Sequence, residues 1–218
     1  MPKIIAICGA KRSGKDVLAE HLVNKYNYER VAFANPLKIA VKNLFNFDDD
    51  QVGIGKDEGT DRKDIVDERW GITPRAALQF FGTEIMQEKI QELLPNMKRN
   101  FFANTLKNYI ENAGNSQNAG NSENAGNSEN AGNSENDKRY VISDLRFIHE
   151  YEMLLNMPNI NIKDITIVRV IRPSENRTKE QDPHVSELEY VDIPYDIIMI
   201  NNGTIDDYIR RFEQIINF

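Results

Sequence analysis

The sequence predicts an α/β protein in which a five-stranded parallel sheet lies between two layers of helices. Five short apolar runs alternate with segments of helical periodicity, and the first run leads directly into a glycine-bounded loop and a helix. Strands that alternate with helices pair in parallel, and ligands bind such sheets at the carboxyl ends of the strands. The 218 residues are 40% hydrophobic, which suffices for one domain over 1–218.

The individual elements follow from local pattern. We expect strands at residues 4–8, 30–34, 139–144, 165–171 and 197–200. We expect helices at 17–26, 37–45, 77–94, 101–110 and 205–216, and one that passes through Glu150, Met153 and Leu154. Pro36 favours the start of the second helix, and Thr204 is a candidate N-cap for the last one. Residues 47–73 are polar, contain three glycines and are expected to form a surface loop.

A hexamer repeat interrupts this pattern. The unit Asn-Ala-Gly-Asn-Ser-Gln/Glu occurs four times in succession from residue 112 onwards. So polar a repeat cannot bury enough surface to offset the entropy of ordering it, which also disfavours a stacked solenoid. We expect 112–136 to be a disordered insertion without a catalytic role.

Composition excludes several classes of function. The net charge is −7 and no long block of Lys or Arg occurs, so a nucleic acid polymer is not an expected partner. Cys8 is the single cysteine, so no internal disulfide can form. No signal peptide or membrane span is evident, which predicts a cytoplasmic protein with no membrane partner, in the host cytoplasm if the source is a virus.

The loop from Gly9 to Asp16 is the most informative motif. Glycines let the backbone wrap closely around an anion, the N–H groups of the helix start face it, and Lys15 can reach outer phosphates. Phosphate loops commonly have Ser or Thr after the lysine, and its hydroxyl binds Mg²⁺. Here the residue is Asp16, so the metal would meet a carboxylate or an intervening water. The alternative is a glycine-rich turn that binds nothing.

Further charged residues are expected near the same edge of the sheet. Asp144 ends a predicted strand and could hold the Mg²⁺ water shell or a substrate hydroxyl, and Arg146 could reach an anionic acceptor. The polar stretch 172–190 contains Arg172 and Arg177 and is expected to act as a mobile lid that supplies cations after substrates bind. A solvated loop is the alternative for this stretch.

Several motifs together resemble the deoxynucleoside monophosphate kinases of bacteriophages and large DNA viruses, which are P-loop kinases. The loop matches the family pattern Gly-x-Lys-Arg-Ser-Gly-Lys-Asp. The other matching segments, in chain order, are 34–38, 78–83, 143–146 with 149–150, 170–173, 184–187 and 200–205. The resemblance covers most of the chain except 47–70 and 112–136.

The resemblance implies an adenylate-kinase-like fold with acceptor-binding and lid subdomains, and the use of ATP and Mg²⁺. The implied ATP-binding residues are Gly9, Lys11, Arg12, Ser13, Gly14, Lys15, Asp16, Val17, Asn202 and Gly203. The implied acceptor-binding residues, mostly in the region 35–111, are Lys38, Arg75, Gln79, Gly82, Thr83, Phe102, Asp144 and Arg146. The implied catalytic residues are Lys15, Arg12, Asp16, Arg172 and Arg177, and the metal is expected at Asp16 and Asp144 through water.

The implied reaction is transfer of the γ-phosphoryl group of ATP to a deoxynucleoside 5′-monophosphate. Val17 departs from the family, which usually has Thr there, so no hydroxyl is available at that position. Two alternatives remain open: a small-molecule kinase similar to phosphomevalonate kinases, and a nucleotide-binding module without turnover. Small molecules are the expected partners, and a homodimer is left open.

Overall fold

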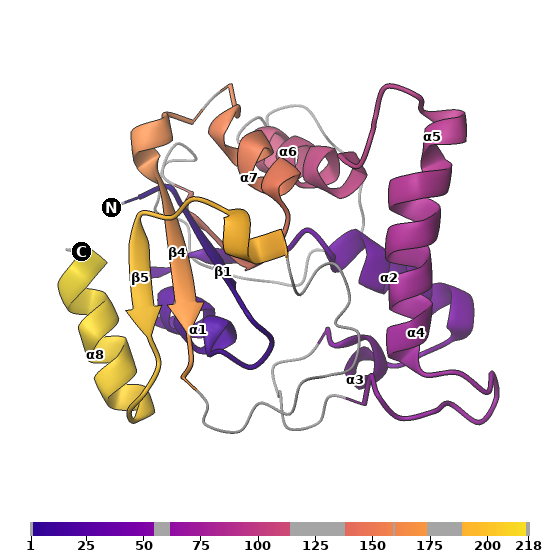
Figure 1. Cartoon of the computed structure of the whole chain (residues 1–218), viewed down its shortest axis with the longest axis horizontal. Coiled ribbons are helices and arrows are strands. Elements are labelled where there is room, and N and C mark those ends of the chain that lie inside the picture. The colour runs from indigo at the N-terminus through magenta and orange to yellow at the C-terminus, as the bar shows by residue number, and fades with distance from the viewer. Residues whose placement is uncertain (1, 55–61, 114–137, 159, 174–188, 217–218) are drawn as a thin grey trace, which may run out of the picture. The chain divides into compact units, whose positions relative to one another are not determined.

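The computed structural model describes residues 2–54, 62–113, 138–158, 160–173 and 189–216. The chain divides into two compact units (Figure 1). The first combines Met1–Val31 with Leu106–Phe218, and the second is Ala32–Thr105. The expectation of one domain over 1–218 stays a prediction.

The first unit contains the sheet. Its elements are β1 (Ile4–Gly9), α1 (Lys15–Tyr26), β2 (Glu29–Val31), β3 (Tyr140–Leu145), α7 (Ile148–Leu155), η4 (Ile162–Asp164), β4 (Ile165–Ile171), η6 (Glu189–Asp192), β5 (Ile197–Ile200) and α8 (Ile205–Ile216). All strand pairs are parallel, in the order β2-β3-β1-β4-β5. The predicted fold class is therefore confirmed.

The strand β1 forms the centre of this unit. It pairs with β3 and β4, with Ile4 opposite both Tyr140 and Ile165, and all six of its residues are buried. Side chains of a strand point alternately to the two faces of the sheet, so both faces must be covered. On one face α1 and α8 contribute Leu18, Leu22, Tyr208 and Phe212 to a shared apolar core, and Figure 1 shows α8 running alongside β5.

The order of the strands has a switch point beside β1. From β1 the chain continues through α1 to β2 at one edge of the sheet, whereas from β3 it continues through α7 to β4 on the other side of β1. Neighbouring strands whose connections leave in opposite directions open a space at their carboxyl ends, where ligands of α/β proteins bind. In this sheet that position lies between the ends of β1 and β3.

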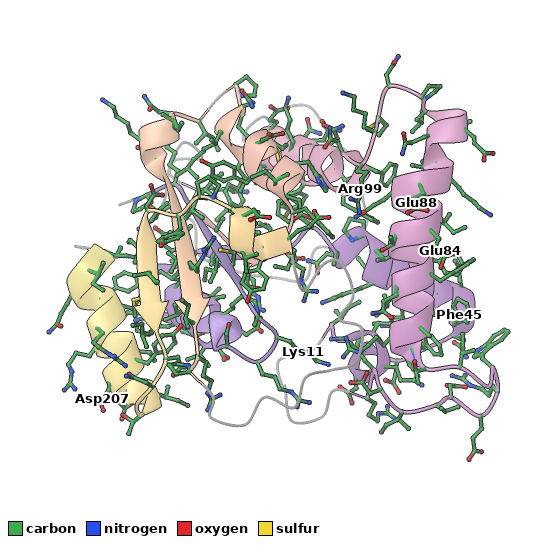
Figure 2. The ribbon with its side chains drawn as sticks, viewed as in Figure 1. Lys11, Phe45, Glu84, Glu88, Arg99 and Asp207 are labelled. Atoms are coloured by element: carbon green, nitrogen blue, oxygen red, sulfur yellow. The ribbon has the colours of Figure 1, made fainter. Side chains whose placement is uncertain are left out.

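The second unit is helical. Its elements are α2 (Asn35–Phe45), α3 (Asp49–Val52), α4 (Pro74–Gln79), the π-helix η2 (Phe80–Lys89), α5 (Ile90–Leu93) and the first part of α6 (Phe101–Ala113), which continues into the first unit. Val41, Phe47, Val52 and Ala77 form its apolar core. Figure 2 labels Phe45 here, whose ring packs edge-to-face on Trp70 and Phe81.

Two expectations for the second unit were wrong in part. The stretch 47–73, expected as a loop, contains α3, because the side chains of Asp48 and Gln51 each bond the other's backbone N–H and Val52 is buried. The helix expected over 77–94 is not a single α-helix, since η2 has π geometry. In η2 the backbone of Gly82 approaches α2 so closely that a Cβ would lie 2.7 Å from Leu37.

The repeat begins inside a helix. Helix α6 extends three residues beyond its predicted end, so Asn112 and Ala113, the first two residues of the repeat, are helical and not disordered as expected. The remainder of the segment, 114–136, lies outside the described residues. No helix in the described ranges is long and apolar enough to cross a membrane.

Candidate functional site

The loop between β1 and α1 depends on two glycines. Gly9 has φ +147°, and a Cβ there would lie 2.4 Å from the carbonyl oxygen of Val170. Gly14 has φ +105°, and a Cβ there would lie 2.5 Å from Nδ2 of Asn201. Side chains rarely adopt these conformations, so both positions require glycine. Arg12, between them, also has a positive φ of 60°.

Lys15 lies across this loop. It is the first residue of α1, only 6% of it is exposed, and its ammonium group donates a hydrogen bond to the carbonyl oxygen of Ala10 at 2.8 Å. The N-cap residue Gly14 provides no side-chain hydrogen bond to the helix. The first N–H groups of an α-helix have no partners within the helix and carry a partial positive charge. A lysine and such a helix start together form a binding site for an anion.

Two polar groups line the base of the loop. The hydroxyl oxygen of Ser13 is buried and has no hydrogen-bond partner among the described residues, which is uncommon for a buried polar atom. Nδ2 of Asn201 donates to the Ser13 carbonyl at 2.9 Å. Asn201 was not among the predicted site residues, yet it directly follows β5 and holds the loop to the end of that strand. A polyphosphate would supply the acceptor that the Ser13 hydroxyl lacks.

The predicted ATP-binding residues Asn202 and Gly203 lie in the turn between β5 and α8. Asn202, Gly203 and Thr204 are exposed, and Oδ1 of Asn202 accepts a hydrogen bond from Nη1 of Arg211 at 3.0 Å. Asn201 therefore links this turn to the phosphate loop, because it is bonded to Ser13 and adjoins Asn202. The structure brings the predicted ATP-binding residues of the two segments into one unit.

Asp16 lies in a cluster that sequence reasoning did not identify. Its carboxylate forms an ion pair with Arg30 of β2 and accepts a hydrogen bond from the hydroxyl of Ser143 at 3.3 Å. The Ser143 oxygen in turn accepts from Nη2 of Arg30 at 2.9 Å. Arg30 and Ser143 are 113 residues apart, so no local pattern could have predicted their contact; only their place on neighbouring parallel strands brings them together.

The end of β3 carries the other predicted acid. Asp144 is half-buried. Its negative charge interacts unfavourably with the charged form of Glu150, a buried residue of α7. Glu150 accepts hydrogen bonds from the backbone N–H of Arg146 at 2.9 Å and of Phe147 at 3.1 Å. These bonds fix the two residues that precede α7. Burial first, and then the charge of Asp144, raise the pKa of Glu150 to about 8. Glu150 therefore holds the backbone from which Arg146 projects.

The predicted lid is described at its two ends only. Arg172 directly follows β4 and is exposed, while Arg177 lies outside the described residues. Beyond the lid, Nη2 of Arg169 donates to the carbonyl oxygens of Tyr190 and Val191 at 3.2 and 3.0 Å, and its guanidinium lies 4.4 Å from the ring centroid of Tyr195. Arg169 therefore anchors the segment that follows the lid.

The predicted acceptor-binding residues fall mainly in the second unit. Lys38 donates to the carbonyl of Gly53 at 2.9 Å, and Arg75 pairs with Asp64, with Nη2 to Oδ2 at 3.1 Å. Gly82 and Thr83 belong to η2, and Lys38 belongs to α2. These two helices pack against each other, with the backbone of Gly82 close to α2. Two further predicted residues differ in exposure: Gln79 is exposed, whereas Phe102 is buried and packs edge-to-face on Phe101.

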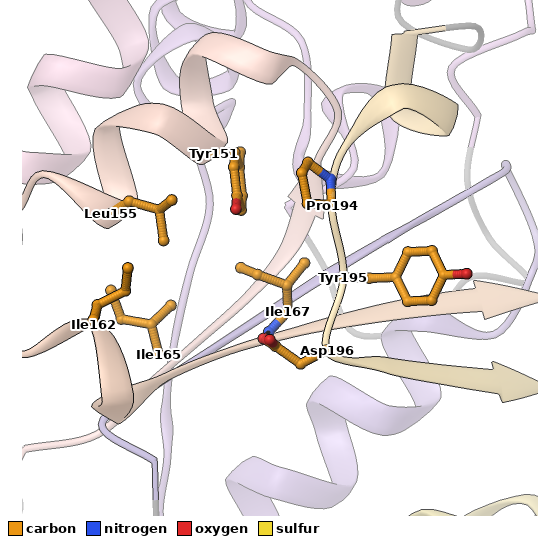
Figure 3. A pocket seen from close by; sticks show the side chains of 8 residues that line it. All are labelled: Tyr151, Leu155, Ile162, Ile165, Ile167, Pro194, Tyr195 and Asp196. Atoms are coloured by element: carbon orange, nitrogen blue, oxygen red, sulfur yellow. Dashed lines mark hydrogen bonds between the residues drawn. The ribbon is translucent and has the colours of Figure 1, made fainter.

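A small cavity lies elsewhere in the first unit (Figure 3). It has a volume of about 120 Å³ and is lined mainly by Tyr151, Leu155, Ile162 and Ile167. Ile167 and the neighbouring lining residue Ile165 belong to the first half of β4, so the cavity is near the amino ends of the strands and away from the phosphate loop. It contains none of the predicted site residues.

Within the described ranges, no group of three or more His, Cys, Asp or Glu side chains is arranged to hold a metal ion. Mg²⁺ in phosphoryl-transfer sites is commonly held by one or two carboxylates together with water and the phosphates of the nucleotide. Asp16, the second residue of α1, and Asp144, near the carboxyl end of β3, are carboxylates of that kind.

Two sequence comparisons point to one family. The profile of the family described as deoxynucleotide monophosphate kinase matches residues 3–61, which include the phosphate loop. A protein of Acanthamoeba polyphaga mimivirus, provisionally named a deoxynucleotide monophosphate kinase, is 28% identical over 216 residues; the match covers 98% of this chain and 94% of that protein. The resemblance to these kinases that the motifs predict is therefore confirmed.

Among solved structures, dephospho-CoA kinase from Campylobacter jejuni matches with a TM-score of 0.43 and 10% sequence identity. That match covers 99% of this chain and 96% of the other.

Proposed function

We propose that this chain transfers the γ-phosphoryl group of ATP to the phosphate of a deoxynucleoside 5′-monophosphate, forming the diphosphate and ADP. One observation carries the proposal: a buried lysine bonds across a glycine-bounded loop, at a helix start whose N-cap residue, Gly14, offers no side-chain hydrogen bond. The similarity to deoxynucleotide monophosphate kinases supports the identity of the acceptor. The net charge of −7 favours free nucleotides over nucleic acid polymers as substrates.

The phosphate loop is proposed to bind ATP. Backbone N–H groups at the start of α1, the ammonium of Lys15 and the buried hydroxyl of Ser13 offer hydrogen bonds to its phosphates. Lys11 and Arg12 add positive charge on the same loop, and Figure 2 labels Lys11 there. The turn at Asn202 and Gly203 is proposed to contact the adenine.

The chemistry requires positioning and charge neutralisation rather than a strong base. The attacking oxygen belongs to the acceptor phosphate and is already anionic, so no proton must be removed from it. Lys15, Arg12 and the lid residues Arg172 and Arg177 are proposed to stabilise the charge that develops on the transferred group. Mg²⁺, held near Asp16 and Asp144 through water, would supply further positive charge there.

The acceptor is proposed to lie against the second unit. Lys38 and Arg75 would bind its phosphate, and Gln79, Gly82, Thr83 and Phe102 would surround its sugar and base. Arg146, whose backbone N–H donates to Glu150, is also proposed as an acceptor-binding residue. The proposed substrates are small molecules, and the proposed compartment is the cytoplasm.

An ADP-release assay tests the function directly. The protein is supplied with ATP and Mg²⁺ and, in turn, with dGMP, dTMP, dCMP, dAMP, the ribonucleotides and phosphomevalonate. We expect turnover with at least one deoxynucleoside monophosphate and none with phosphomevalonate. Turnover with phosphomevalonate alone would favour the small-molecule kinase, and nucleotide binding without any turnover would favour the binding module.

A further inference from the structure

Arg30 forms a cluster with Asp16 and Ser143 that the proposed reaction does not by itself explain. The guanidinium of Arg30 pairs with the Asp16 carboxylate, and both groups contact the hydroxyl of Ser143, at 2.9 Å from Arg30 and 3.3 Å from Asp16. Ser143 is only 5% exposed, so it holds the two charged groups on a fixed support. The cluster joins the end of β2, the end of β3 and the start of α1.

The position of Asp16 poses an electrostatic problem. It is the second residue of α1, at the helix start that is proposed to receive the phosphates of ATP. A carboxylate at this position repels a polyphosphate, and the repulsion between two charges falls off only with the reciprocal of their distance where little salt screens it. Phosphate loops with Ser or Thr at this position carry no such charge.

We propose that Arg30 is a positioning residue that neutralises Asp16 and thereby determines how strongly nucleotide binding depends on Mg²⁺. With Arg30 in place, the loop accepts a nucleotide whether or not a divalent ion accompanies it. Without Arg30, Asp16 loses this cation, and its charge repels the phosphates more strongly unless Mg²⁺ offsets it. The proposal rests on the assignment of the loop as the nucleotide site.

A merely structural role for Arg30 makes a different prediction. Both charged side chains of the pair are about 40% exposed, at 41% for Arg30 and 39% for Asp16, and ion pairs at that exposure add little to folding stability. The Arg30→Gln variant is therefore expected to fold. If Arg30 only supported the local fold, its loss would weaken binding of the nucleotide equally with and without Mg²⁺.

The test measures binding of the fluorescent analogue mant-ADP to the full chain, once in EDTA and once in excess Mg²⁺. For Arg30→Gln we expect the Kd to rise about tenfold in EDTA and about twofold or less in Mg²⁺, with the EDTA effect shrinking as salt is added. Arg30→Lys, which keeps the charge, should restore most of the affinity. The double variant Arg30→Gln/Asp16→Asn should bind in EDTA nearly as well as the wild type.

Lys25→Gln is the matched control. Lys25 lies at the other end of α1, where its ammonium pairs with Glu213, so its loss also breaks an ion pair of the same helix. Its Kd should equal that of the wild type in both conditions. Equal weakening by Arg30→Gln in EDTA and Mg²⁺, or no rescue by Asp16→Asn, would overturn the inference while leaving the nucleotide site intact. A wild type that binds no mant-ADP would instead refute the proposed function and, with it, the premise here.

Discussion

Helices α1 and α8 pack beside each other on one face of the sheet, but their N-termini are built differently. At α8 the hydroxyl of Thr204 accepts from the N–H of Asp207 at 3.2 Å and donates to the Asp207 carboxylate at 2.8 Å. Asp206 and Asp207 also place negative charge in the first turn. At α1 the N-cap is Gly14, which has no side chain to offer.

The difference separates a helix start whose N–H groups are capped by a side chain of the protein from one that we propose to bind a ligand. The first N–H groups of any α-helix need acceptors, and their partial positive charge favours an anion. At the start of α8 the Thr204 hydroxyl accepts a backbone N–H, and the carboxylates of Asp206 and Asp207 supply negative charge. The α1 start has one carboxylate of its own, Asp16, which is paired with Arg30. It also has a glycine N-cap, a buried lysine and a Ser13 hydroxyl that has no hydrogen-bond partner among the described residues. The same backbone feature therefore contributes to stability in α8, whereas in α1 we propose that it contributes to binding.

The largest expected effect comes from removing the lysine at the α1 start. Lys15→Ala should reduce turnover by on the order of 10²-fold or more, because it removes a charge that stabilises the transferred phosphoryl group. Turnover is measured by ADP release, and circular dichroism checks that the variant is folded. A folded variant with near-normal turnover would refute the assignment of this loop.

A side chain at the N-cap of α1 should also be damaging. Gly14→Ala combines a φ of +105° with a Cβ placed 2.5 Å from Asn201, so we expect it to cost about 1–3 kcal/mol of stability and to weaken nucleotide binding at least tenfold. Thermal unfolding and mant-ADP titration measure the two effects. Gly71→Ala is the control, because Gly71 has φ +67° but, its chain neighbours apart, no atom of the described residues lies within 4 Å of its Cβ position. Gly71→Ala should lower the stability but leave the affinity for mant-ADP unchanged. Equal losses of affinity in the two variants would argue against a special role for Gly14.

Removing the N-cap of α8 should lower the free energy of unfolding. Thr204→Ala removes the hydroxyl that caps Asp207, and loss of such a cap costs about 1 kcal/mol. Urea denaturation should show a lower midpoint with an unchanged slope. Thr204→Ser keeps the hydroxyl and should retain most of the stability; if it is as unstable as the alanine variant, the cap is not the source of the effect.

The smallest effect is expected at the opposite ends of the two helices, where Glu213 of α8 bonds to residues of α1. Hydrogen bonds from Lys25 and Tyr26 lower the pKa of Glu213 to about 2, below its value of about 4.5 in the unfolded chain. A carboxyl group with a lowered pKa stabilises the folded state above the unfolded pKa and stops doing so as the pH falls through the folded pKa.

Wild type should therefore be more stable than Glu213→Gln at pH 7, and the difference should shrink between pH 4.5 and pH 2. Denaturation of both proteins across this range measures it. A difference that does not change with pH would show that it does not come from the ionised carboxylate of Glu213.

Much of the fold could be predicted because its elements have local causes. The strands at 165–171 and 197–200 were predicted at the residues where they occur, since each is a short apolar run bounded by polar residues. The Thr204 cap was predicted from a single residue before an amphipathic helix. The capping box at Asp48 has the sequence pattern Asp-x-x-Gln, but the glycines that follow it favoured the prediction of a loop.

The contacts of the site could not be predicted in the same way. The phosphate loop is a continuous motif, so its residues were identified together. The partners of Asp16 come from β2 and β3, and the amide that holds Ser13 comes from the end of β5, 188 residues away. Such contacts depend on the order of strands in the sheet, which the pattern of apolar runs does not contain. The π geometry of η2 likewise has no signature in the spacing of its apolar residues.

Cys8 gives the protein a built-in reporter of how often its sheet opens. It is the single cysteine of the chain, it is completely buried in β1 one residue before the phosphate loop, and burial raises the pKa of its thiol. A thiol reagent can reach it only when the central strand separates from its neighbours, so the rate of labelling reports that opening event. Any ligand that binds the loop and stabilises the closed sheet would slow the labelling, without a mutation or an added probe.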